Sequence, residues 1–154
     1  MLNNLLLIIA LSGIVSVSNQ RAEYSIKWLF NIEEAKIEAD EKGKPILISF
    51  AGSDWCKPCI KLTREVFETE KFSDYAAEKF VLVMADFPRY KKNRLSADQT
   101  IHNELLASQY NQGGEFPLVV IIDSNGKVLA KTGYQEGGPE NFITHLDTLL
   151  VRME

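Results

Sequence analysis

Cysteine is scarce in this chain, because Cys56 and Cys59 are its only two cysteines among 154 residues. A framework of several disulfides is therefore excluded, and the pair is a redox centre, one structural disulfide or half of a metal site. Zinc is the weakest of these interpretations, since there is no second CxxC pair and His102 and His145 are too far apart for a zinc-finger pattern. We therefore expect neither a metal nor another cofactor.

An excess of basic residues is also missing. The chain has 17 basic and 21 acidic residues, a formal net charge of -4. This balance argues against a nucleic-acid partner, which usually requires a basic face. The sequence shows no internal repeat, low-complexity tract or long linker. We therefore expect residues 19–154 to form a single domain with one core, and we expect a monomer.

The N-terminus has no charged side chain before Arg21. Residues 5–17 form an apolar run of signal-peptide length, shorter than the ~20 residues of a comfortable membrane span, and Ser16 and Ser18 supply small residues for cleavage. These features predict a signal peptide over residues 1–18 and a periplasmic or other extracytoplasmic location. Because no Lys or Arg precedes the run, an uncleaved membrane anchor through the same apolar residues is the alternative.

The residues on either side of the cysteines predict their local structure. An apolar run at residues 46–50 leads in, and an amphipathic segment at residues 60–67 leads out. This order indicates a buried strand, a tight turn and a helix, with Cys56 at the helix N-terminus. Pro58 fits the first helical turn, where a missing backbone N–H costs little.

That position suits a reactive thiol. The thiolate is the reactive form of cysteine, and a free thiol with a pKa of about 8.5 is mostly protonated at neutral pH. Backbone N–H groups at a helix start stabilise the anion, and Lys57 adds a nearby cation. We therefore predict that Cys56 attacks a substrate disulfide and that Cys59 resolves the mixed disulfide. Trp55 can shield the reactive sulfur and offer the substrate an apolar contact.

Hydrophobic periodicity and turn signals predict an α/β chain. We expect strands at residues 24–28, 46–50, 80–85, 117–122 and 127–131, the last two joined by the hairpin signal Asp-Ser-Asn-Gly. We expect helices after Asn31, Cys56, Thr69 and Ser96, and from about Pro139 onward. Ser96 and Gln99 form the pattern of a capping box. Early βαβ units followed by a hairpin and a closing helix predict a sheet with helices on both sides.

Residues 55–59, Trp-Cys-Lys-Pro-Cys, resemble the active-site motif of thioredoxins. The likeness extends over most of the chain after residue 25 and includes residues 44–50, 115–117 and 123–128. It implies a thioredoxin-like α/β fold, with a central mixed β-sheet flanked by helices on both faces.

The resemblance also gives a role to the pair Phe116-Pro117. In thioredoxins a cis-proline opens a strand of the central sheet and faces the cysteines. By this resemblance Pro117 shapes the substrate groove, and the backbone of Phe116 pairs with an extended substrate segment. A cis X-Pro bond is uncommon enough to be a deliberate feature where it occurs. The alternative is an ordinary trans proline at the start of an edge strand.

Two features depart from the thioredoxin pattern. Thioredoxins place a buried acid in the strand before the motif, where it assists proton transfer to the resolving cysteine, and the matching position here is Ser49. A serine cannot act as a general base near neutral pH, so Asp54, a water or a substrate group would have to serve. The second departure is an insertion near residues 87–104, and its basic run at residues 88–94 is either a solvated loop or a surface for an acidic partner or anionic lipid heads. Such differences are more typical of extracytoplasmic thioredoxin-like proteins.

These observations predict a thiol–disulfide oxidoreductase that acts on disulfide-containing or thiol-containing proteins. The motif favours a reductant, which in an oxidising compartment needs a membrane thiol carrier as its electron donor, whereas Lys57 favours the opposite direction by stabilising the thiolate. Two alternatives stay open. One is a thioredoxin-fold binding or chaperone module with a static disulfide, and the other is a role in cofactor assembly, such as keeping cytochrome cysteines reduced.

Overall fold

The computed structural model describes residues 26–151, so the predicted signal peptide and the alternative anchor lie outside the described residues. A five-stranded sheet forms the centre, in the order β1-β3-β2-β4-β5. Its strands are β1 (Trp28–Leu29), β2 (Ile46–Ala51), β3 (Val81–Asp86), β4 (Leu118–Ile122) and β5 (Val128–Thr132). β1, β3 and β2 run parallel, whereas β4 is antiparallel to β2 and β5 is antiparallel to β4.

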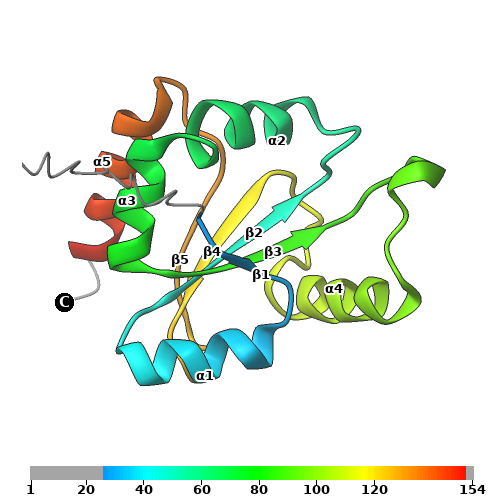
Figure 1. Cartoon of the computed structure of the whole chain (residues 1–154), viewed down its shortest axis with the longest axis horizontal. Coiled ribbons are helices and arrows are strands. Elements are labelled where there is room, and N and C mark those ends of the chain that lie inside the picture. The colour runs from blue at the N-terminus through cyan, green and yellow to red at the C-terminus, as the bar shows by residue number, and fades with distance from the viewer. Residues whose placement is uncertain (1–25, 152–154) are drawn as a thin grey trace, which may run out of the picture.

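Helices cover both faces of this sheet (Figure 1). One face carries α1 (Ile32–Lys42) and α4 (Ala97–Tyr110), and the other carries α2 (Lys57–Leu62), α3 (Glu70–Lys79) and α5 (Gly138–Val151). α2 continues into a π-helical turn, η1 (Thr63–Phe67), and a 3-10 turn, η2 (Lys91–Asn93), lies between β3 and α4. Within residues 26–151, no helix has the length and apolar character needed to cross a membrane. The mixed sheet with helices on both faces confirms the predicted architecture.

β2 is the centre of the packing, since every residue of this strand is buried. Successive side chains of a strand point to opposite faces of the sheet. Ile48 and Phe50 therefore pack into the core beneath α1 and α4, whereas Leu47 packs with Phe72 and Phe142 beneath α3 and α5. Fully burying one such side chain contributes roughly 1.5–3 kcal/mol. Two apolar cores thus hold β2, and the turn that follows it, from both sides.

Strand direction determines where the loops meet. β2 and β3 end side by side, with Ala51 opposite Asp86, and β4 begins at the same edge, with Leu118 opposite Phe50. The loops that follow Ala51 and Asp86 therefore meet the loop that precedes Leu118. Open α/β sheets bind their ligands at the carboxyl ends of the parallel strands, so this edge is where a functional site is expected.

Most local predictions are confirmed. Asn31 and Thr69 cap α1 and α3, and α1 ends at Gly43 with φ 61°, a left-handed conformation that favours glycine. The first strand, predicted at residues 24–28, is tested only in part, because residues 24 and 25 lie outside the described residues; residues 26 and 27 are not in a strand, and β1 begins at Trp28. Of the residues that the structure describes, only Trp28 and Leu29 in this part of the chain pair with β3.

The predicted capping box at Ser96 is only half formed. Ser96 Oγ accepts a hydrogen bond from the Gln99 backbone N–H at 3.2 Å, as expected. The Gln99 side chain, however, donates to the Phe30 carbonyl at 2.9 Å and to the Asn103 side chain at 2.8 Å. It thereby ties α4 to the end of β1, a long-range contact that competes with the local one.

Replacing Asn31 with alanine is expected to lower the free energy of unfolding by about 1 kcal/mol. The Asn31 side-chain oxygen accepts hydrogen bonds from the Glu33 and Glu34 backbone N–H groups at 2.8 and 3.3 Å, and alanine removes this acceptor. Asn31→Asp keeps the acceptor and is the matched control, with most of the stability retained. Urea unfolding of the three proteins measures the difference, and an unchanged midpoint for Asn31→Ala would contradict the assigned cap.

Candidate redox-active site

Cys56 and Cys59 lie at the start of α2 and are joined by a disulfide, with an S–S distance of 2.05 Å. Cys56 is the N-cap residue, as predicted, and its Sγ accepts a hydrogen bond from the Cys59 backbone N–H at 3.2 Å. Cys59 Sγ accepts one from the Gly52 N–H at 3.5 Å. The cysteines are nearly buried, with exposed fractions of 4% and 2%, whereas Lys57 and Pro58 are exposed beside them. Each sulfur therefore has a backbone N–H donor, a partner that stabilises a thiolate.

Trp55 forms a wall beside the disulfide. Its indole N–H donates to the Phe87 carbonyl at 2.7 Å, and its ring meets Phe116 edge to face with centroids 5.4 Å apart. Trp55 and Phe116 both pack against the cluster of Ala51 and the two cysteines. Gly52 lies beneath the indole, where a Cβ would come within 2.3 Å of the ring carbon Cε2. The turn after β2 thus needs glycine for the indole to occupy this position.

The peptide bond between Phe116 and Pro117 is cis, and both residues are half-buried just before β4. The loop that precedes them is held by the buried Asn111. Its side chain donates to the Glu115 carbonyl at 2.8 Å and accepts from the Glu115 N–H at 2.9 Å. Because β4 pairs with β2, this loop brings Phe116 against the cysteine cluster. The sequence-predicted residues of the motif and of the Phe116-Pro117 pair therefore gather at one edge of the sheet.

Ser49 occupies the buried position that the resemblance assigned to it. It is 1% exposed and lies opposite Met84 of β3 and Val119 of β4. A buried hydroxyl cannot take a proton near neutral pH as a carboxylate does. The acid that assists the resolving cysteine in thioredoxins therefore has no counterpart at this position.

Asp54 does not fill that role, because it holds the segment that follows β3. Its Oδ1 accepts from the Arg89 N–H, and its Oδ2 accepts from the Tyr90 N–H and the Asn93 side-chain amide, each at 2.9 Å. Partial desolvation raises the pKa of Asp54, but the hydrogen bonds, led by the one from the Arg89 N–H, outweigh it and hold the pKa below its ordinary value. A carboxylate stabilised in its ionised form is a poor proton acceptor. Of the three substitutes considered for the missing acid, the geometry disfavours Asp54.

Two contacts at the site were missed by the sequence reasoning. The Arg89 guanidinium carbon lies 3.7 Å from the centroid of the Trp55 ring, a cation–π contact. Asp86 accepts hydrogen bonds from the Ser53 backbone N–H and hydroxyl at 2.9 and 2.6 Å. Each contact joins residues far apart in the chain that meet because β2 and β3 end side by side. The only sequence feature related to these contacts was the basic run at residues 88–94. That run does not indicate that Arg89 contacts Trp55.

Comparison with known proteins decides the family. A family model described as a thioredoxin-like domain matches residues 32–150. The chain belongs to this thioredoxin-like family. One relative is the disulfide bond reductase DsbH of Chlamydia pneumoniae, 35% identical over 117 residues that span 76% of this chain and 69% of the relative. Another is the thioredoxin-related protein DsbJ of the same organism, 28% identical over 132 residues that span 86% of this chain but 37% of that longer protein.

Solved structures agree with the family. A structure described as DsbH oxidoreductase is 32% identical and superimposes with a TM-score of 0.75, covering 82% of this chain and 85% of its own. A thioredoxin from Thermus thermophilus is 17% identical, with a TM-score of 0.62 over 83% of this chain and 89% of its own, and shares the fold. The thioredoxin-like fold inferred from the Trp-Cys-Lys-Pro-Cys motif is therefore confirmed.

Replacing Asp54 with asparagine is expected to release the basic segment of this thioredoxin-like protein. An amide cannot accept all three hydrogen bonds, so trypsin should cleave within residues 89–94 faster than in the wild type at neutral pH. Asp74→Asn, an equal loss of one exposed charge on α3, is the matched control. Unchanged cleavage of Asp54→Asn would contradict the anchoring role.

The same variant has an expected pH dependence. Because the folded-state pKa of Asp54 lies below its ordinary value of 3.8, the stabilisation from its ionised form is present above that value and is lost as the pH falls through the folded-state pKa. The difference in unfolding midpoint between wild type and Asp54→Asn should therefore be constant near neutral pH and narrow in acid. A difference that grows in acid would overturn the assignment.

Proposed function

We propose that this protein reduces disulfides in exported proteins, with Cys56 as the attacking thiol and Cys59 as the resolving thiol. The chain is a thiol–disulfide oxidoreductase of the thioredoxin-like family. The observation that carries the assignment of roles is the position of Cys56 at the start of α2, where its sulfur accepts a helix N–H. Cys59 is buried against the turn that follows β2. This position suits a thiol that attacks only the Cys56 sulfur of the same chain.

In the proposed reaction, the Cys56 thiolate attacks one sulfur of a substrate disulfide. The substrate S–S bond breaks, a mixed disulfide forms at Cys56, and the leaving substrate thiolate takes a proton. The Cys59 thiolate then attacks the Cys56 sulfur, releases the second substrate thiol and closes the Cys56–Cys59 disulfide. Two electrons pass from the protein to the substrate. The disulfide in the structure corresponds to the state reached at the end of this sequence.

The proton on Cys59 needs an acceptor for the second step. With Ser49 in place of an acid and Asp54 turned toward residues 89–93, the acceptor in this proposal is a water or the substrate thiolate released in the first step. The Gly52 N–H that donates to Cys59 Sγ would stabilise the thiolate once formed.

The residues around the disulfide form the proposed substrate groove. Trp55 and Phe116 present ring edges beside the cysteines, and Lys57 and Pro58 are exposed at the start of α2. Phe116 and Pro117 directly precede β4, and in this proposal an extended substrate segment pairs with the Phe116 backbone before the strand begins. Lys57 would favour the thiolate of Cys56 through its charge.

A reductant of exported proteins implies a location and a donor. The apolar N-terminal run supports an extracytoplasmic location, as a secreted or membrane-anchored protein. Thiols are continually oxidised in such compartments, so the protein would need a membrane thiol carrier to return the Cys56–Cys59 disulfide to the dithiol. The name of the Chlamydia pneumoniae relative, a disulfide bond reductase, supports this direction.

Single cysteine variants test the roles. Cys56→Ser is expected to abolish reduction of a protein disulfide such as that of insulin, because no attacking thiol remains. Cys59→Ser should instead accumulate a mixed disulfide between Cys56 and the substrate, visible on a non-reducing gel and by mass spectrometry. Insulin reduction by Cys56→Ser at the wild-type rate would refute the assignment.

The redox potential of the pair separates the proposed function from its alternatives. Equilibration against glutathione and dithiothreitol buffers is expected to give a redox potential of about −270 mV, as for a reductant. A value near about −120 mV would indicate an oxidant of newly exported chains. A disulfide that stays closed below about −300 mV would indicate a binding module with a static disulfide.

A further inference from the structure

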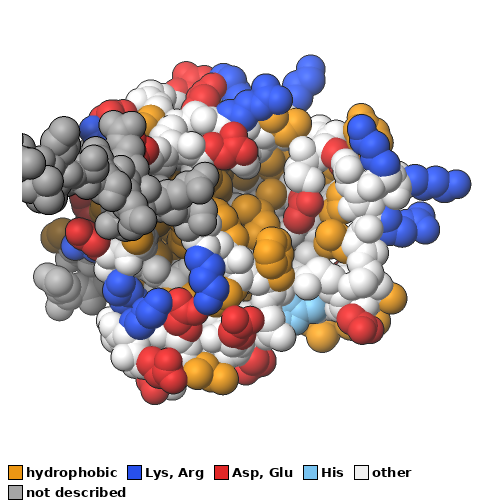
Figure 2. Space-filling view, in the orientation of Figure 1, with side chains coloured by type: hydrophobic (Ala, Val, Ile, Leu, Met, Phe, Trp, Pro, Cys, Tyr) orange, Lys and Arg blue, Asp and Glu red, His pale blue; other side chains and the backbone are white. Residues whose placement is uncertain are grey.

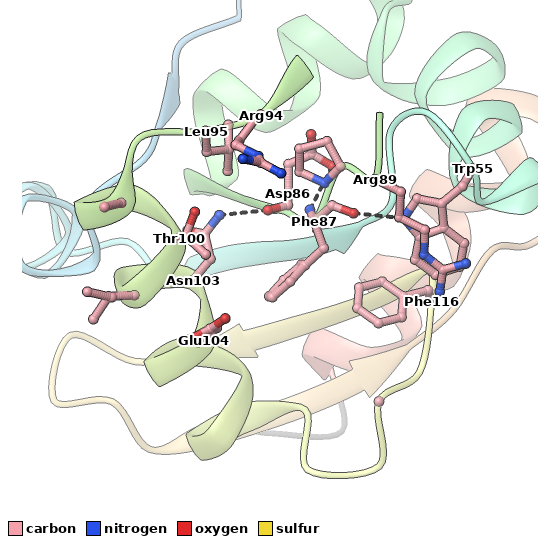
Figure 3. A pocket seen from close by; sticks show the side chains of 14 residues that line it. Trp55, Asp86, Phe87, Arg89, Arg94, Leu95, Thr100, Asn103, Glu104 and Phe116 are labelled. Atoms are coloured by element: carbon pink, nitrogen blue, oxygen red, sulfur yellow. Dashed lines mark hydrogen bonds between the residues drawn. The ribbon is translucent and has the colours of Figure 1, made fainter. Parts of the chain in front are cut away.

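A cavity of about 810 Å³ lies on the Trp55 side of the site (Figure 3). Its near wall is formed by Trp55 and Phe116, and most of the rest comes from the chain between the end of β3 and the first half of α4, including the apolar Phe87, Leu95 and Ile101. The two cysteines, Lys57, Pro58 and Pro117 do not line it. The cavity is therefore a separate compartment next to the proposed groove, sharing only its two aromatic walls.

Four cations lie in the wall of this cavity or beside it in the chain. Arg89 and Arg94 line it, and Lys91 and Lys92 lie between them on η2. None of the ion pairs found within residues 26–151 involves these four side chains. Figure 2 shows the Lys and Arg side chains projecting around the connection between β3 and α4. In a chain of net charge -4, this is a local basic surface within an acidic protein.

Three acids lie close to these cations. The Asp54 carboxylate accepts from backbone and side-chain N–H groups of residues 89–93, and Asp86 accepts from Ser53. Glu104, on α4, also lines the cavity and faces it from the far side. Three acids, Asp54, Asp86 and Glu104, therefore stand against the four cations of residues 89–94, because a hydrogen bond from a neutral donor does not remove the charge of a carboxylate, and one positive charge is left over. An acidic occupant would match that excess.

Exposed apolar side chains extend the cavity outward. Ile101 and Leu105, one turn apart on α4, have exposed fractions of 56% and 64%, and Tyr90 beside η2 is 56% exposed. Ile101 also lines the cavity, so the exposed pair on α4 adjoins its opening, and apolar surface of this kind is found at contact sites for other proteins. A small polar ligand would gain nothing from them, whereas a polypeptide would cover them.

We propose that this cavity binds an apolar side chain of the substrate protein and that the surrounding cations select substrates with acidic residues beside it. The inference rests on the proposed reductase function and names its preferred substrate class: proteins with an apolar and acidic segment near the reactive cysteine. Trp55 and Phe116 line the cavity and also pack on the cysteine cluster, so a chain attached at Cys56 reaches the cavity by passing them. An extended chain advances about 3.3 Å per residue, so the apolar anchor would lie within a few residues of the substrate cysteine.

The test uses synthetic peptides as substrates. Each peptide carries one cysteine as a mixed disulfide with 5-thio-2-nitrobenzoate and a phenylalanine about three residues away, flanked by two glutamates, two glutamines or two lysines. A parallel set has alanine in place of phenylalanine. The reduced protein converts each peptide disulfide to a free peptide thiol and free thionitrobenzoate while its own Cys56–Cys59 pair is oxidised, so single-turnover absorbance gives the rate. We expect the glutamate peptide to react about tenfold faster than the lysine peptide, with the difference lost at about 0.5 M NaCl because salt screens exposed charges.

Two variants test the two halves of the surface. Lys92→Glu/Arg94→Glu should bring the ratio of the glutamate-peptide rate to the lysine-peptide rate to one or below. The control Lys79→Glu/Lys127→Glu makes the same change of charge on α3 and the hairpin, and it should keep the wild-type ratio. Ala97→Trp adds a large side chain at the cavity wall and should remove the advantage of phenylalanine over alanine. Each ratio is internal to one variant, so a uniform loss of activity cancels. Wild-type ratios near one, or ratios that the variants leave unchanged, would overturn the inference.

Further controls separate this inference from the proposed function. If the wild type fails to reduce both the peptides and the neutral probe 2,2′-dithiodipyridine, the reductase function itself is refuted. If the probe is reduced but all the peptides react at the same rate, only the proposed substrate selection is refuted. Sedimentation with phosphatidylglycerol vesicles that is lost in Lys92→Glu/Arg94→Glu, without any peptide preference, would assign the cations to a lipid surface and also overturn the inference.

Discussion

The parallel pairing of β2 with β3 is the constraint on which the site depends. Ala51 lies opposite Asp86, so the turn that carries Cys56 and the segment that follows β3 leave the sheet side by side. Hydrogen bonds then join the two segments between Ser53 and Asp86, Trp55 and Phe87, and Asp54 and Arg89. A shift of one residue would turn every β2 side chain to the opposite face, and the two apolar cores oppose it.

The polar environment of the two sulfurs is made by the backbone. The Cys59 and Gly52 N–H groups donate to the sulfurs, and Ser49 stands where thioredoxins have a buried acid. An N–H group stabilises a thiolate without being able to accept its proton. In the proposed reaction, these donors would stabilise a thiolate, and proton transfer would be left to water or substrate.

In the proposed function, the fold separates the reactive disulfide from the surface that selects the substrate. The sheet and α2 position the disulfide, whereas the cavity and its cations come from the connection between β3 and α4. Function resides in such local surfaces rather than in the fold itself. Asp54 links the two parts, because it precedes the motif in sequence while holding the backbone of Arg89 and Tyr90. The residues proposed to select a substrate are therefore fixed beside the sulfurs without contributing to their chemistry.

The sequence by itself determined most elements and the position of the cysteines. Asn31, Gly43 and Thr69 act on their own helices through local hydrogen bonds, and the hairpin signal after β4 acts over a few residues, so neighbours in the chain suffice to predict them. The apolar run before the cysteines and the amphipathic segment after them likewise predicted the pair at a helix start. Only the tertiary structure decided the start of β1, the turning of Gln99 toward Phe30, the anchoring role of Asp54 and the cavity with Arg89 over Trp55. These contacts join segments that are distant in the chain, and their partners are chosen by strand register and packing, which no local pattern encodes.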